Sequence, residues 1–147
     1  MYVRPVRCSI STILLLLPFL CFAQSEPRGI TIDDIIAMQT IGDPQVSADG
    51  AWVAYTVRQR DLKEDKSVTQ IWIVATDGGE PVAMTSTDNS ASSPRWSPDN
   101  KYLSFKAAKG EDAKSQVWNL NRLGGEATQV TNVVQGIDSY AWSPDGS

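Results

Sequence analysis

The chain has 147 residues, of which 17 are acidic and 13 are basic, so its net charge is −4, and 41% of the residues are hydrophobic. This length suits one ordinary domain, the composition is that of a globular protein, and the acidic balance argues against nucleic acid as a partner. The chain contains no histidine, which excludes a histidine general base and imidazole metal ligands.

Residues 1–23 have the features of a secretory signal peptide. A basic start is followed by an apolar run from Ile10 to Phe22, and small residues precede the expected cleavage point between Ala23 and Gln24. We therefore expect a periplasmic or secreted protein that meets the membrane only through this segment during export. An uncleaved membrane anchor is the alternative, although the apolar run is shorter than the ~20 residues that a span requires.

The next segment, residues 24–41, is predicted to be a lead-in that contains one short helix. Thr31 and Asp34 form an N-cap pair. Apolar residues then recur with helical spacing, at Ile32, Ile35 and Ile36. We expect this helix to pack against the rim of the domain that follows.

Residues 42–147 contain an internal repeat. The run Pro44–Gly50 aligns with Pro94–Asn100 at an offset of 50 (94 − 44), and a third copy begins at Trp142. The later run Gln70–Trp72 aligns with the equivalent tripeptide 46 residues on (116 − 70). Such a period is typical of stacked structural units rather than of a single irregular domain.

Each repeat reads as four short strands separated by Asp-Gly, Asp-Asn or Gly-Gly turns. In the first repeat the expected strands lie around Asp43–Val46, Ala51–Val57, Gln70–Ala75 and Pro81–Thr85. The charged segment Arg58–Thr69 carries the length difference between the repeats and is predicted to be a surface loop.

The predicted fold class is all-β. The second strand of each repeat has apolar residues on both faces, as a strand covered from both sides does. Four-stranded sheets stacked at this period are the blades of a β-propeller, so residues 42–147 are expected to form two blades and the start of a third. Because a closed ring takes roughly 4–8 blades, we expect the chain to be part of a longer protein. A small capped solenoid is the alternative.

No catalytic, metal-binding or cofactor-binding residue is predicted, and no cofactor. Both cysteines, Cys8 and Cys21, lie within the expected signal peptide, which leaves no thiolate for catalysis or zinc. The recurring Asp49, Asp99 and Asp145 could suggest calcium, but one aspartate per repeat favours turn capping instead. A Gly-x-Ser-x-Gly nucleophile motif and a phosphate-binding glycine loop are both missing from the sequence.

The runs Ile32–Met38 and Gly42–Val57 resemble the start of secreted bacterial members of the prolyl oligopeptidase family of serine peptidases, the dipeptidyl- or acylaminoacyl-peptidase-like members. The blocks Ile71–Pro81 and Pro94–Asp99 look like propeller blades of that family. The blade motifs alone are less specific, because periplasmic propellers of the TolB type share Trp-Ser-Pro-Asp-Gly.

The resemblance implies a propeller that gates the access of short peptides to a C-terminal α/β-hydrolase domain with a Ser, an Asp and a His. None of those catalytic residues has a counterpart in this sequence. The resemblance therefore implies a non-catalytic, N-terminal propeller part of an exported serine peptidase, which meets peptide substrates through the catalytic domain. A TolB-like propeller that acts as a protein-binding module is the alternative function.

Overall fold

Nearly all of the regular secondary structure in the described residues is β-strand. A computed structural model describes residues 28–61, 64–110 and 113–146. The predicted signal peptide, with its cleavage point between Ala23 and Gln24, lies outside these residues. In the described ranges, no helix is long and apolar enough to cross a membrane.

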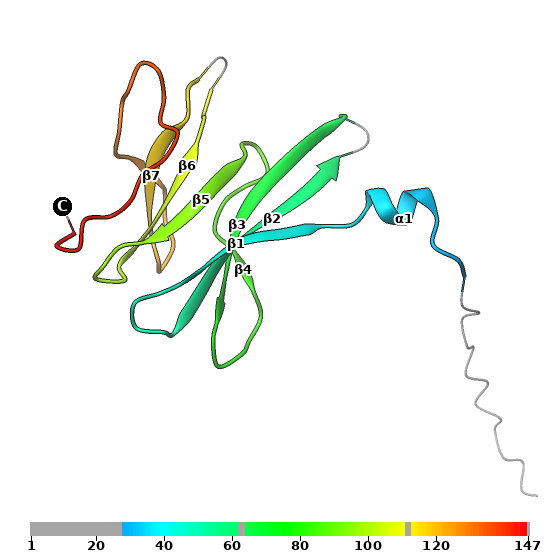
Figure 1. Ribbon diagram of the computed structural model, residues 1–147, viewed down its shortest axis with the longest axis horizontal. Coiled ribbons are helices and arrows are strands. Elements are labelled where there is room, and N and C mark those ends of the chain that lie inside the picture. The colour runs from blue at the N-terminus through cyan, green and yellow to red at the C-terminus, as the bar shows by residue number, and fades with distance from the viewer. Residues whose placement is uncertain (1–27, 62–63, 111–112, 147) are drawn as a thin grey trace, which may run out of the picture.

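One short helix precedes two four-stranded antiparallel sheets, each with its strands in sequence order (Figure 1). The helix is α1 (Ile32–Ile36). The first sheet contains β1 (Thr40–Val46), β2 (Trp52–Asp61), β3 (Lys66–Ala75) and β4 (Val82–Ala83). The second contains β5 (Ala91–Trp96), β6 (Tyr102–Ala107), β7 (Gln116–Asn121) and β8 (Thr128–Gln129). This order of antiparallel strands confirms the predicted four-stranded blades.

The same turn joins the first two strands of each blade. Ser97 Oγ donates to Asp99 Oδ1 at 2.6 Å and accepts the Tyr102 backbone N–H at 2.9 Å. The equivalent Ser47 hydroxyl donates to Asp49 and accepts the Trp52 N–H in the same way. Asp49 and Asp99 each accept the backbone N–H two residues on, at 3.1 Å, so the predicted turn-capping role of these two aspartates is confirmed.

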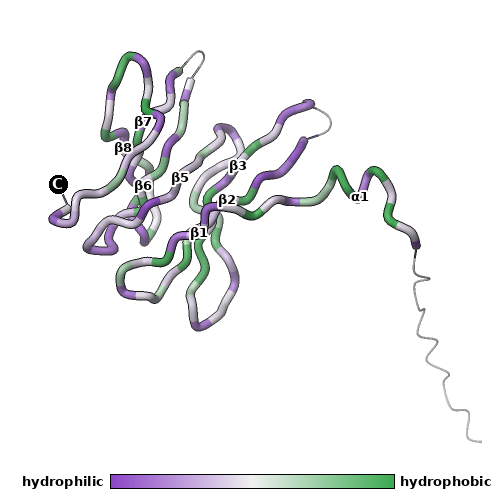
Figure 2. The backbone as a smooth tube through the Cα atoms, viewed as in Figure 1, coloured by the Kyte–Doolittle hydropathy of each residue, from purple (hydrophilic) through white to green (hydrophobic). Residues whose placement is uncertain are grey.

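The core lies between the two sheets, where β5 packs against β1, β2 and β3. Ile71 of the first sheet and Leu103 of the second have no exposed surface, and the apolar segments of the strands converge here (Figure 2). The Trp96 indole is 9% exposed, and its Nε1–H donates to the Gln45 carbonyl of β1 at 3.0 Å. The sheets are thus joined by apolar burial and by a directional hydrogen bond.

The prediction of a surface loop over Arg58–Thr69 is wrong for most of that segment. Residue pairs from Arg58↔Thr69 to Asp61↔Lys66 continue the β2–β3 ladder beyond the end of the blade. The reason is that an antiparallel ladder needs only paired backbone groups, so a charged insertion without an apolar pattern still forms a two-stranded extension. We call the paired residues 58–61 and 66–69 the hairpin extension.

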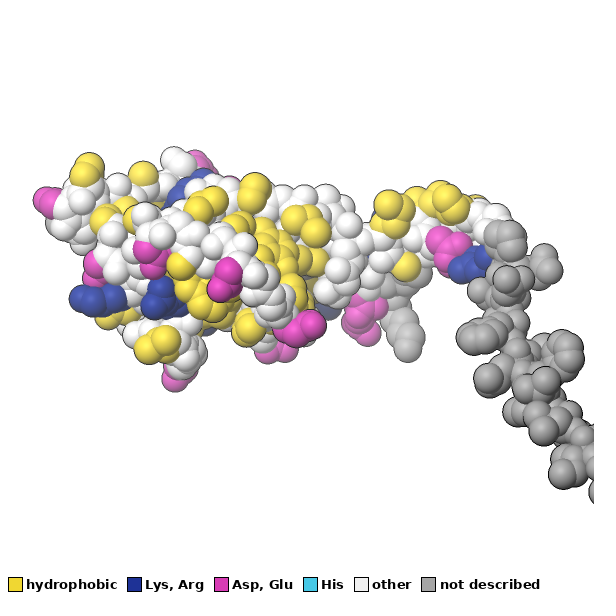
Figure 3. Space-filling model, turned by 90° about the horizontal axis from the view of Figure 1, so that it is seen from below, with side chains coloured by type: hydrophobic (Ala, Val, Ile, Leu, Met, Phe, Trp, Pro, Cys, Tyr) yellow, Lys and Arg dark blue, Asp and Glu magenta, His cyan; other side chains and the backbone are white. Residues whose placement is uncertain are grey.

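The predicted capping box of α1 is present, with the Thr31 hydroxyl and the Asp34 carboxylate each bonded to the other residue's backbone N–H. The helix buries none of its residues, however, and Ile32 and Ile35 are 75% and 59% exposed. The expectation that it packs against the domain is therefore wrong. Since β1 runs outward along the hairpin extension, α1 lies away from the core (Figures 1 and 3).

The segment that leads into the third copy of the repeat lies against the second sheet. The Ile137 N–H donates to the Ser115 carbonyl at 2.8 Å, and the Tyr140 hydroxyl donates to the Ser93 carbonyl at 2.7 Å. The Ser143–Asp145 hydrogen bond repeats the blade turn. Residues 130–146 form turns and extended chain but no strand. This segment is the start of a third blade.

Candidate functional site

The first strand of each blade contains a β-bulge at the same place. Asp43 and Ser93 have positive φ angles of 44° and 54°, and the strand register shifts at both positions. A proline follows each of them and has no N–H to contribute to the ladder. Bulges bend a strand and redirect its side chains. The first strands of the two blades therefore have backbone and side-chain groups outside the strand pairing at equivalent positions.

Polar side chains from three successive repeats meet at these bulges, and we call them the inner-strand cluster. Its members are Asp43, Gln45, Arg95 and Tyr140. The Arg95 Nη1 atom lies 3.1 and 3.2 Å from the two carboxylate oxygens of Asp43. Gln45 Nε2 donates to the same carboxylate at 2.9 Å. The Asp43 and Arg95 side chains are about one-third exposed, at 34% and 35%, so the cluster is open to solvent.

The electrostatics of the cluster favour hydrogen bonding over proton transfer. Burial raises the pKa of the Tyr140 hydroxyl well above its usual value of 10, with an opposing effect from Arg95 and a reinforcing one from Asp43. Tyr140 therefore stays a neutral hydrogen-bond donor at physiological pH. The cluster can bind polar groups such as peptide amides or carboxylates.

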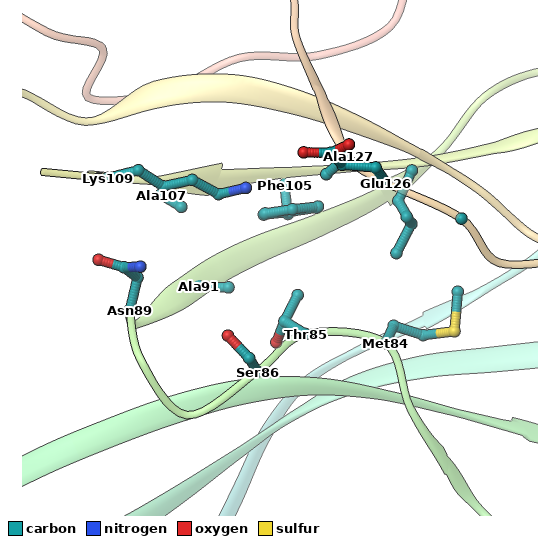
Figure 4. Close-up of a pocket in the computed structure, with 12 residues that line it drawn as sticks. Met84, Thr85, Ser86, Asn89, Ala91, Phe105, Ala107, Lys109, Glu126 and Ala127 are labelled. Carbon is teal, nitrogen blue, oxygen red and sulfur yellow. The ribbon is translucent and has the colours of Figure 1, made fainter.

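A pocket of about 220 Å³, which we call the inter-blade pocket, opens between the two sheets on the side away from β1. Figure 4 shows the Phe105 ring between the loop that carries Thr85 and Asn89 and the segments that carry Lys109 and Glu126. The repeat pattern gives no sign of this site, because the pocket exists only where two blades diverge.

No group of three or more potential metal-ligating side chains occurs within the described ranges. Asp49, Asp99 and Asp145 each serve a separate turn, and the structure does not bring them together. In the charged segment Asp61–Lys66, Asp61 ends β2 and Lys66 begins β3, and residues 62–63 lie outside the described ranges. Trp72 and Trp118 are both half-buried at equivalent positions in their blades, and Trp118 packs against the core.

Comparison with known proteins relates this chain to peptidases. It is 38% identical over 84 residues to the uncharacterized peptidase YuxL of Bacillus subtilis, a match that covers 57% of this chain and 13% of that protein. It is 31% identical over 81 residues to dipeptidyl-peptidase 5 of Porphyromonas endodontalis, covering 55% and 12%. No protein-family profile matches the chain.

Among solved structures, an acylaminoacyl peptidase in complex with Z-Gly-Gly-Phe-chloromethyl ketone superposes with a TM-score of 0.63 at 25% identity, over 76% of this chain and 17% of that one. The β-propeller domain of the trilobed protease of Pyrococcus furiosus gives 0.58 at 24%, over 74% and 32%. The resemblance to the prolyl oligopeptidase family is confirmed. The chain spans about an eighth of the length of the two related peptidases, 13% and 12%.

The blades could be located from the sequence, but the inner-strand cluster was missed. The repeat alignment contains a signal for it, because Asp43 aligns with Ser93 and Gln45 aligns with Arg95. Positions that pack identically in each blade tend to keep the same residue type. Charged residues at positions that differ between repeats therefore indicate a role specific to one blade. That Asp43 and Arg95 contact each other is evident only from the geometry of the bulges.

Proposed function

We propose that this chain forms the opening blades of a propeller that gates the access of short peptides to the active site of an exported serine peptidase, and that the chain itself is not catalytic. The sequence relationship to peptidases supports the enzyme class. The observation that carries the gating role is the inner-strand cluster, whose Asp43–Arg95 pair bridges the first strands of two successive blades.

First strands of propeller blades line the central channel. In a closed ring the cluster would face that channel and present an arginine and a carboxylate to a passing chain. Amide groups of an extended peptide can exchange hydrogen bonds with such side chains, whereas a folded protein cannot enter a channel of that kind. The cluster would thus select for short, unfolded substrates by size and by polar contact.

The gating role is tested in the protein that contains both the propeller and a catalytic domain. Asp43→Ala and Arg95→Ala are compared with the wild type on a dipeptidyl substrate and on peptides of ten or more residues. We expect the ratio of kcat/KM for long and short substrates to change by several-fold, because the pair lies on the route and not at the reacting bond. Equal effects on every substrate length would refute the gating role.

For this chain alone we expect no hydrolysis of aminoacyl or dipeptidyl chromogenic substrates, since it has no histidine to act as a general base. Turnover by the purified chain that a serine-directed inhibitor abolishes would contradict this.

Export is proposed from the sequence of residues 1–23. Mass spectrometry of the N-terminus after expression in a bacterial host should show a mature chain that starts at Gln24, recovered in the periplasm or the medium. Retention of Met1 in a cytoplasmic fraction would argue against export.

The alternative is a TolB-like propeller that binds other proteins, since that class shares the Trp142–Gly146 motif. The coding sequence downstream separates the two. A Gly-x-Ser-x-Gly motif followed by an Asp and a His supports the peptidase, and a stop codon after the last blade supports the binding module.

A further inference from the structure

The floor of the inter-blade pocket is apolar and lies deep between the sheets. It is formed by Ala91, Phe105, Ala107 and Leu120, which are between 1% and 4% exposed and belong to the core. Met84 packs beside them from the first sheet. A ligand that entered this pocket would therefore place an apolar group against aromatic and aliphatic carbon, where its removal from water is favourable.

The mouth of the pocket carries one cation and one anion. The Lys109 ammonium lies 4.0 Å from the centroid of the Trp118 ring, a cation–π contact that holds it beside the opening. Glu126 is exposed at the end of the β7–β8 turn. Lys109 and Glu126 form no ion pair with each other or with any other residue of the described ranges. Both charges remain available to a ligand.

Neutral hydrogen-bonding groups complete the mouth. Thr85, Ser86 and Asn89 lie on the loop opposite Lys109 and Glu126 (Figure 4). The site thus combines an apolar floor, a cation and an anion at the rim, and polar side chains across from them. Such a combination of an apolar lining with a few placed polar groups is typical of small-molecule sites.

We propose that the inter-blade pocket binds the zwitterion of an apolar α-amino acid, with the side chain on the Phe105 floor, the carboxylate at Lys109 and the ammonium at Glu126. The pocket volume of about 220 Å³ lies below the ~300–1,000 Å³ of sites for drug-sized ligands, which restricts the occupant to a molecule of this size. The proposal rests on the pocket and does not depend on the peptidase assignment.

Isothermal titration calorimetry of the purified chain tests the proposal with four ligands. L-leucine carries all three recognised features, L-leucinamide lacks the carboxylate, N-acetyl-L-leucine lacks the ammonium and L-serine lacks the apolar side chain. We expect saturable binding of leucine and at least about tenfold weaker binding of each of the others, the factor that the loss of one charge-assisted contact brings. Absence of saturable leucine binding overturns the proposal.

Two exposed variants assign the contacts. Lys109→Met should weaken leucine binding about tenfold and leave leucinamide binding unchanged, while Glu126→Gln should do the same for leucine and leave N-acetyl-leucine unchanged. Glu80→Gln is the matched control, because Glu80 occupies the same position of the first repeat and does not line the pocket. Equal effects of Glu80→Gln and Glu126→Gln, or equal effects on blocked and free ligands, would show that the charges do not recognise the zwitterion.

Discussion

Two equivalent tryptophans are predicted to differ in their contribution to stability. Trp72 and Trp118 occupy the same position in successive blades, and both side chains are half-buried. The Trp118 Nε1–H donates to the Ala107 carbonyl at 3.1 Å. The Trp72 Nε1–H is buried, and no acceptor lies within hydrogen-bonding distance of it among the described residues. Replacement by phenylalanine removes the same atoms at both positions and therefore isolates the hydrogen bond.

The difference follows from the cost of polar groups. Trp118→Phe removes a hydrogen bond with a net value of about 1 kcal/mol, and the phenyl ring still offers a face to Lys109. Trp72→Phe instead removes a buried donor without a partner, which costs about 1–3 kcal/mol in the native chain. The loss of ring area is common to both. Trp118→Phe should therefore destabilise the chain by about 2–4 kcal/mol more than Trp72→Phe.

Urea unfolding followed by far-ultraviolet circular dichroism measures both free energies of unfolding, with equal m values as the control for a common unfolded state. The reasoning is refuted if Trp72→Phe is as destabilising as Trp118→Phe.

Three further predictions concern the turns, the inner-strand cluster and a crowded glycine. Hydrogen bonds from Ser97 and the backbone lower the pKa of Asp99 from 3.8 to about 2. The contribution of the Asp99 carboxylate to stability is therefore present above pH 4 and is lost as the pH falls toward 2. In an acid titration, the difference in stability between wild type and Asp99→Asn should vanish over that range. A double-mutant cycle on Asp43 and Arg95 should give a coupling energy below about 1 kcal/mol, because the pair is one-third exposed, and a value above 3 would contradict this. Gly136→Ala should lower the thermal midpoint more than Gly124→Ala: both glycines have positive φ, but a Cβ at Gly136 would lie 3.1–3.3 Å from the Lys114–Ser115 segment, and one at Gly124 would meet open space.

The features that could be predicted from the sequence are those set by residues close together in the chain, which recur with the same role in each blade. The Trp-Ser-Pro-Asp turn and the Gly-Gly turn specify local geometry through capping and positive φ, so the blades and their strand order follow from the repeat alone. The capping box of α1 is local in the same sense and was also predictable.

Features that depend on contacts between distant residues could not be predicted in this way. Arg95 meets Asp43 only because two bulges bring neighbouring strands together, and the inter-blade pocket exists only because two sheets diverge. The hairpin extension was missed because its ladder is held by backbone groups, which leave no apolar pattern in the sequence. The exposed face of α1 was missed because helical periodicity identifies an apolar side but not what covers it.

The outermost strands have a consequence for the behaviour of the chain in solution. β4 and β8 are each two residues long, so the outer margin of each blade offers few open backbone groups to a neighbouring molecule. A long, flat edge strand can pair with a strand of another molecule and so promote fibril formation, whereas a very short edge strand offers too few backbone groups for such pairing. The short outer strands thus disfavour amyloid-type association at the outer edges of the blades. The blades associate instead through their broad faces.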